Sequence, residues 1–188
     1  MRWIAVVLVA CSASSTPAPA PAASATWRVP AGWKSETIAF PLDFAPSLGH
    51  RGAEELRFAP GFFDPGAPGY WSYTFVWRLD DPTTLTGEQL ADELVVYFRG
   101  LAQAVDPALA VDVIRVDANP GAASRFDVHA IVVDAFKTKQ PLAVAGWAKR
   151  TPCERGALWT FVLAPERSAL RPQLDALAAE ATCAQQAR

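Results

Sequence analysis

The chain has 188 residues, of which 51% are hydrophobic and 19% are charged, as in an ordinary globular protein. Its net charge of −2 argues against a nucleic-acid partner, which would need lysine and arginine gathered into a stripe that neutralises phosphates. The charge also leaves no basic patch for an anionic membrane surface. Because a chain of this size can bury a core without help, we expect neither a structural metal nor a cofactor.

The first residues contain a short apolar run behind one positive side chain. Residues 4–10 read Ile-Ala-Val-Val-Leu-Val-Ala and follow Arg2. The run is too short to cross about 30 Å of hydrocarbon, but it is typical of a secretory signal peptide. We therefore expect residues 1–10 to be a signal peptide and the protein to be exported.

The four residues Leu8-Val9-Ala10-Cys11 directly follow this apolar run. They resemble the lipobox of bacterial lipoproteins, and the resemblance implies cleavage before Cys11, lipidation of Cys11 with chains such as palmitate, and a membrane anchor. Ser12 is not the aspartate that marks inner-membrane lipoproteins in enteric bacteria, so the resemblance favours the outer membrane, facing the periplasm. The alternative is an unlipidated signal cut later, within residues 18–25, which gives a soluble periplasmic or secreted protein.

Residues 12–26 carry no charge and no large apolar side chain, and proline alternates with alanine in part of them. Such a segment cannot bury enough surface to fold. Polyproline II geometry makes it a semi-rigid tether of about 40 Å. We expect a disordered tether over residues 11–26 and one globular domain over residues 27–188.

Within the domain, the apolar pattern predicts three strands, a helix, four strands and a second helix. The clearest strand alternates large apolar residues from Trp71 to Leu79, and the first helix can begin with a capping box formed by Thr86 and Gln89. The predicted strands cover residues 36–40, 54–59, 70–79, 111–116, 125–136, 142–149 and 159–163, and the predicted helices cover residues 86–105 and 170–182.

This order of elements predicts an α+β fold. We expect a mostly antiparallel sheet of about six or seven strands, with both helices packed on one face, the aromatic one.

Three stretches, Phe40-Pro-Leu-Asp-Phe-Ala-Pro, Gly52-Ala-Glu-Glu-Leu-Arg-Phe-Ala-Pro-Gly61 and Tyr70-Trp-Ser-Tyr73, resemble a family of uncharacterised exported bacterial proteins. The resemblance covers roughly residues 33–101. It implies export and a single domain, and it supplies no catalytic residues.

Three cysteines leave one unpaired in an exported protein. If acyl chains occupy Cys11, then Cys153 and Cys183 remain as a pair in an oxidising compartment, and we expect them to form a disulfide. The alternative is a reactive Cys153 thiolate beside Lys149 and Arg150.

Histidine, the usual residue of metal and general-base chemistry, occurs only at His50 and His129. Neither has metal-ligand spacing, so we expect no metal site. His129 shares a strand face with Asp127 and could be an acid-oriented base, but a polar solvent face is the preferred interpretation. His50 lies in the turn-like Gly49-His-Arg-Gly52 and is expected in a surface loop.

The sequence contains no serine elbow, phosphate loop or dinucleotide fingerprint. We therefore expect a non-enzymatic binding module of the cell envelope, whose partner is an envelope protein or a small ligand. The alternative is an envelope hydrolase with two facing carboxylates. Its candidate acids are Glu54, Glu55, Asp64, Asp80 and Asp81.

The segment from Phe58 to Trp71 concentrates five aromatic rings among glycine and proline residues. Rings in loops are either folded into the core or exposed for binding. We expect Phe58 and Trp71, which border strands, to be core. Phe62, Phe63 and Tyr70 are the predicted binding surface, because rigid rings supply contact area at little entropy cost.

Overall fold

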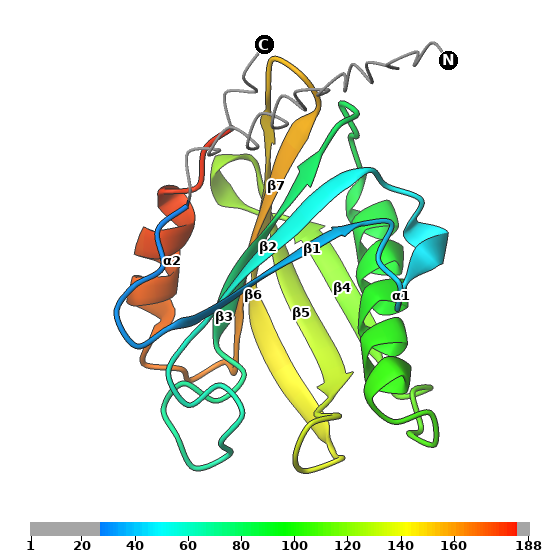
Figure 1. Ribbon diagram of the computed structural model, residues 1–188, viewed down its shortest axis with the longest axis vertical. Coiled ribbons are helices and arrows are strands. Elements are labelled where there is room, and N and C mark those ends of the chain that lie inside the picture. Colours follow the sequence, from blue (N-terminus) through cyan, green and yellow to red (C-terminus); the bar gives the residue numbers. More distant parts are fainter. Residues whose placement is uncertain (1–26, 184–188) are drawn as a thin grey trace, which may run out of the picture.

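A computed structural model describes residues 27–183 (Figure 1). The described part contains seven strands and two α-helices in the predicted order. Two short 3₁₀ helices, Pro46–Leu48 and Ala122–Ser124, lie in the connections. The strands are β1 (Lys34–Phe40), β2 (Gly52–Phe58), β3 (Tyr73–Leu79), β4 (Arg115–Pro120), β5 (Arg125–Val133), β6 (Pro141–Pro152) and β7 (Ala157–Ala164), and the helices are α1 (Gly87–Val105) and α2 (Arg171–Ala179).

The seven strands form one sheet in the order β1-β2-β3-β7-β6-β5-β4, and every neighbouring pair is antiparallel. Strands β1 to β3 are neighbours along the chain, and so are β4 to β7. Among the described strands, the two groups are joined by the pairing of β3 with β7, in which Phe75 lies opposite Phe161. The predicted α+β class with an antiparallel sheet is confirmed.

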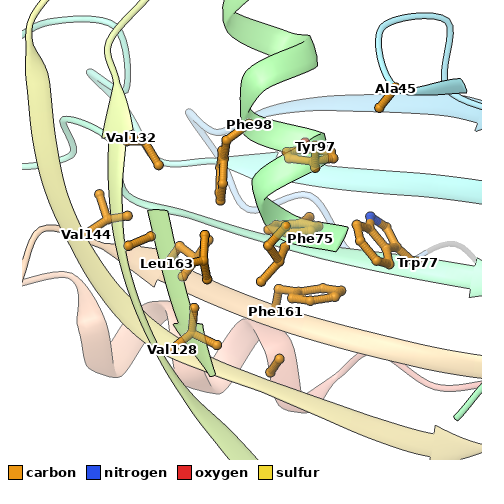
Figure 2. Close-up of a cluster of buried hydrophobic side chains, with 14 of the residues drawn as sticks. Ala45, Phe75, Trp77, Tyr97, Phe98, Val128, Val132, Val144, Phe161 and Leu163 are labelled. Carbon is orange, nitrogen blue, oxygen red and sulfur yellow. The ribbon is translucent and has the colours of Figure 1, made fainter. Parts of the chain in front are cut away.

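Helix α1 packs across one face of the sheet and closes the larger hydrophobic core (Figure 2). The rings of Phe75 and Phe161 stack with their centroids 4.4 Å apart, and Tyr97 of α1 lies parallel to Phe75 at 5.8 Å. The helix begins with the predicted capping box, in which Thr86 and Gln89 each accept a hydrogen bond from the other's backbone N–H.

Helix α2 packs on the opposite face, so the prediction that both helices share one face is wrong (Figure 1). Leu177 joins a cluster with Val76 and Leu158, while Leu174 joins Val162. All eight residues of β7 are buried. A strand that is apolar at nearly every position is covered on both faces of its sheet. Such a strand shows no alternation of apolar and polar residues, so its sequence does not indicate which face a helix covers.

Several strand boundaries differ from the predicted ones, and turns explain the differences in the third and fourth strands. The backbone N–H of Ile114 donates to the carbonyl of Val111, so the fourth strand covers Arg115–Pro120 instead of residues 111–116. Trp71 has a φ of 48°, and β3 therefore begins at Tyr73 instead of residue 70. Turns of this kind depend on tertiary packing and leave little trace in the apolar pattern.

The chain enters the described domain beside α2. Trp27 is buried, and its indole Nε1 donates a hydrogen bond to the carbonyl of Leu177 at 2.8 Å. None of the described helices is long and apolar enough to cross a membrane. The predicted signal peptide (residues 1–10), the tether (residues 11–26) and the lipidation site Cys11 lie outside the described residues.

Candidate functional site

Helix α2 covers the central part of its sheet face, because its main contacts are with β7 and β3. A hollow of about 430 Å³ lies between α2 and the uncovered parts of β5 and β6. We refer to it as the α2 hollow. Its volume falls in the range of small-molecule sites. The residues that give it chemical character are Arg125, Trp147, Lys149, Thr151, Thr160 and Asp175.

Strand register brings these polar side chains together. Arg125 of β5 is paired with Lys149 of β6, and Lys149 is paired with Thr160 of β7. Directly paired residues point to the same face of a sheet, so the three side chains form one row along the floor of the hollow. Thr160 is buried, whereas Lys149 is exposed.

Trp147 forms a wall between the floor and α2. Its indole Nε1 donates a hydrogen bond to Asp175 Oδ1 at 2.7 Å, and its ring packs against the apolar cluster beneath α2. The guanidinium of Arg125 lies 5.2 Å from the centre of the Trp147 ring, which is within cation–π distance. These contacts hold the Trp147 ring and the Arg125 head group in defined positions.

The aromatic loop does not form the predicted exposed surface. Phe62 is only 5% exposed and packs against Phe58 and Trp71. Phe63 is half-buried, and the hydroxyl of Tyr70, also half-buried, donates a hydrogen bond to Asp134 Oδ2 at 2.7 Å. The prediction is wrong for Phe62 because the loop folds back on itself. The backbone N–H of Trp71 donates to the carbonyl of Phe62, which turns this ring inward.

The two aromatic residues that border strands, Phe58 and Trp71, differ in burial. Trp71 is buried, as predicted, whereas Phe58 is half-buried. A hollow of about 330 Å³ lies beside the loop, and we refer to it as the loop hollow. Phe63 lines it together with Lys34 and Lys137, and Lys34 Nζ lies 5.7 Å from the centre of the Phe63 ring.

Glu54, the first candidate acid, is buried beneath α1. Its Oε1 accepts a hydrogen bond from Trp77 Nε1 at 3.1 Å, and its Oε2 has no hydrogen-bond partner among the described residues. Burial raises the pKa of Glu54 to about 7. A carboxyl group enclosed in the core in this way cannot contact a substrate.

The other candidate acids are not arranged as a catalytic pair with Glu54. Glu55 follows Glu54 on β2, so the two side chains point to opposite faces, and Glu55 is held in ion pairs with Arg57 and Arg78. Asp64 accepts a hydrogen bond from the backbone N–H of Gly66. The remaining two acids, Asp80 and Asp81, are exposed at the end of β3.

The two histidines lie in different settings. His50 is not an exposed loop residue as predicted, because its Nε2 lies 2.8 Å from Glu93 Oε2 and its side chain is only 11% exposed. Its ring packs against Phe40 and Trp77, which draws the loop onto the core. His129 is exposed, as is Asp127. The described residues contain no group of three or more metal-binding side chains.

The predicted disulfide between Cys153 and Cys183 is confirmed, with the two Cα atoms 5.6 Å apart. It ties the hairpin between β6 and β7 to the residues that follow α2. Cys153 is therefore not a reactive thiolate in this structure.

No protein-family model, curated protein or solved structure matches the chain. The site must therefore be interpreted from its own geometry. Sequence reasoning did not single out Arg125 or Trp147, and it named Lys149 only as a neighbour of Cys153, although it placed all three on strands. The available signal was a strand face that stays polar beside a buried one, and only the register between β5 and β6 shows that these residues meet.

Proposed function

We propose that the protein is a lipid-anchored binding module of the cell envelope, attached through Cys11 and binding a small ligand in the α2 hollow. The lipobox and the tether support the anchor. Ser12 stands where inner-membrane lipoproteins of enteric bacteria have aspartate, and this difference favours the periplasmic side of the outer membrane. The observation that carries the binding role is the α2 hollow itself, which has the volume of a small-molecule site and a fixed aromatic wall.

The alternative proposal, an envelope hydrolase, has weaker support. Glu54 is enclosed in the core and Glu55 is held in ion pairs. The other candidate acids, Asp64, Asp80 and Asp81, lie exposed in turns and at the end of a strand. Glycoside hydrolysis needs two carboxyl groups that face each other across a substrate. The α2 hollow has Asp175 in its lining, and this carboxylate accepts a hydrogen bond from Trp147.

The anchor is tested by labelling cells with radioactive palmitate and separating membranes from soluble envelope contents. The wild-type protein should carry the label and fractionate with membranes, because multiple acyl chains make release slow. Cys11→Ser should lose the label and become soluble, while the matched control Ser12→Ala should keep both properties. An unlabelled wild-type protein in the soluble fraction would support the secreted alternative.

The binding role is tested on the Cys11→Ser protein, which needs no detergent. A screen of small envelope components by nuclear magnetic resonance should show shifts of the Trp147 indole signal for at least one of them. If every perturbation instead centres on residues far from the α2 hollow, the site is wrongly placed.

A further inference from the structure

The α2 hollow places two positive side chains directly opposite each other. Arg125 and Lys149 are paired across β5 and β6, and like charges in this arrangement destabilise a sheet. Neither side chain forms an ion pair with any described residue. The lining of the hollow therefore holds two cations, Arg125 and Lys149, against one carboxylate, Asp175.

The Arg125 head group also retains hydrogen-bonding capacity. Its Nε is buried and has no hydrogen-bond partner among the described residues. An unsatisfied buried donor is costly, and most such groups in folded proteins find a partner. The Trp147 ring holds the guanidinium, so the remaining donors have a restricted direction.

The carboxylates near the hollow form no ion pair with these cations. Asp175 keeps its charge but is held by the hydrogen bond from Trp147, and Asp127 is exposed on the same strand as Arg125. The hydroxyls of Thr151 and Thr160 line the hollow and can donate to or accept from a ligand. An anion that accepts several hydrogen bonds would satisfy the free Arg125 donor and the two hydroxyls together and would offset the excess positive charge.

We propose that the α2 hollow is an oxyanion site that binds a phosphate or carboxylate group carried by a small polar molecule. The inference rests on the proposed binding function and names the chemistry of its ligand. Arg125 supplies a fixed planar donor set, Lys149 supplies a mobile charge, and the threonine hydroxyls complete the contacts. The volume of about 430 Å³ accommodates a sugar phosphate, a sugar acid or a single lipid headgroup.

The experiment titrates the Cys11→Ser protein at low ionic strength with inorganic phosphate, glycerol phosphate and glucuronate, with uncharged glucose as the matched probe. Saturable binding of the anionic probes and not of glucose is expected. Arg125→Gln and Lys149→Gln should each weaken phosphate binding by about tenfold or more, the loss expected for one charge-assisted hydrogen bond. Vesicles of phosphatidylglycerol, compared with phosphatidylcholine, distinguish a lipid headgroup from a free phosphate ester.

The control is Lys137→Gln, which removes an exposed lysine from the loop hollow. It should leave phosphate affinity unchanged. Without phosphate, Lys149→Gln should not lower the melting temperature, because it removes a repulsion, whereas a purely structural lysine would lower it. Equal weakening by Lys137→Gln, or no saturable binding of any anionic probe, would overturn the oxyanion site. Glucose binding that perturbs Trp147 would preserve the binding module while rejecting its anionic ligand.

Discussion

Trp77 Nε1 donates a hydrogen bond to Glu54 across the pair of strands β2 and β3, and it satisfies only one of the two carboxyl oxygens. The second oxygen has no donor in good hydrogen-bond geometry among the described residues, and the surrounding core is aromatic. Burial therefore favours the neutral acid and raises the pKa of Glu54 to about 7. The hydrogen bond from Trp77 and the nearby hydroxyl of Tyr97 oppose part of this rise.

The first prediction follows from the difference between the folded and unfolded states. The pKa of Glu54 is about 7 when folded and 4.5 when unfolded, so the folded protein binds more protons between these values. The free energy of unfolding should fall as pH rises through this window, by up to about 3 kcal/mol. Urea denaturation at a series of pH values between 4 and 8 measures this change.

Glu54→Gln should remove most of that pH dependence and raise stability at pH 8, because the amide resembles the protonated acid. The matched control is Glu36→Gln, which changes an exposed carboxylate on β1 near Glu54. It should leave the pH dependence nearly intact. If the free energy of unfolding changed with pH equally in the wild type and in Glu54→Gln, the pH dependence would not come from Glu54.

The second prediction concerns Asp134, a buried acid that organises the connection between β5 and β6. Burial alone would raise its pKa, but the backbone and hydroxyl of Thr138 and the hydroxyl of Tyr70 donate hydrogen bonds that outweigh burial and lower the pKa to about 2. The backbone N–H groups of Phe136 and Lys137 donate to the same carboxylate. This contribution to stability is present above the unfolded pKa and is lost as pH falls towards 2.

Asp134→Ala should therefore cost about 3 kcal/mol or more, because several donors lose one acceptor. Tyr70→Phe removes a single hydrogen bond and should cost about 1 kcal/mol. Thermal unfolding at neutral pH compares the two variants. If both variants lost the same stability, the hydrogen bonds from the backbone and from Thr138 to Asp134 would contribute nothing beyond the single bond from Tyr70.

The third prediction separates core from surface in the aromatic loop. Phe62→Ala should destabilise the protein by about 3 to 5 kcal/mol, since it empties a buried ring site. Phe63→Ala should lower the free energy of unfolding by less, because the Phe63 ring is only half-buried. Melting temperatures measure both, and an unchanged value for Phe62→Ala would restore the predicted exposed surface.

The fourth prediction concerns the disulfide. The bond closes a loop with a sequence separation of 30 residues, and the chain-entropy model assigns such a loop about 3 to 4 kcal/mol. The double variant Cys153→Ser with Cys183→Ser should lose about this much in urea denaturation. Reducing agent should produce a similar loss in the wild type and none in the variant, and wild type insensitive to reduction would argue against the bond.

The order of strands and helices could be predicted because each element has its own local signal. Thr86 and Gln89 mark the start of α1, and the alternation after Trp71 marks β3. The face covered by α2 could not be predicted, because β7 is apolar at positions that point both ways. The α2 hollow could not be predicted either, since Arg125 and Lys149 meet only through the register of β5 and β6.

The single junction between β3 and β7 has a consequence for how the chain folds. Strands β1 to β3 come first along the chain, yet the inner edge of β3 pairs only with β7 among the strands of residues 27–183. This edge therefore has no partner until β7 is available. Contacts between such distant residues require closure of a long loop and are formed slowly. Completion of the sheet therefore waits for the last strand of the chain. A chain whose sheet is completed only by its last strand stays incompletely folded until nearly all of it has emerged. Transport of a polypeptide through a membrane in the unfolded state requires such late folding.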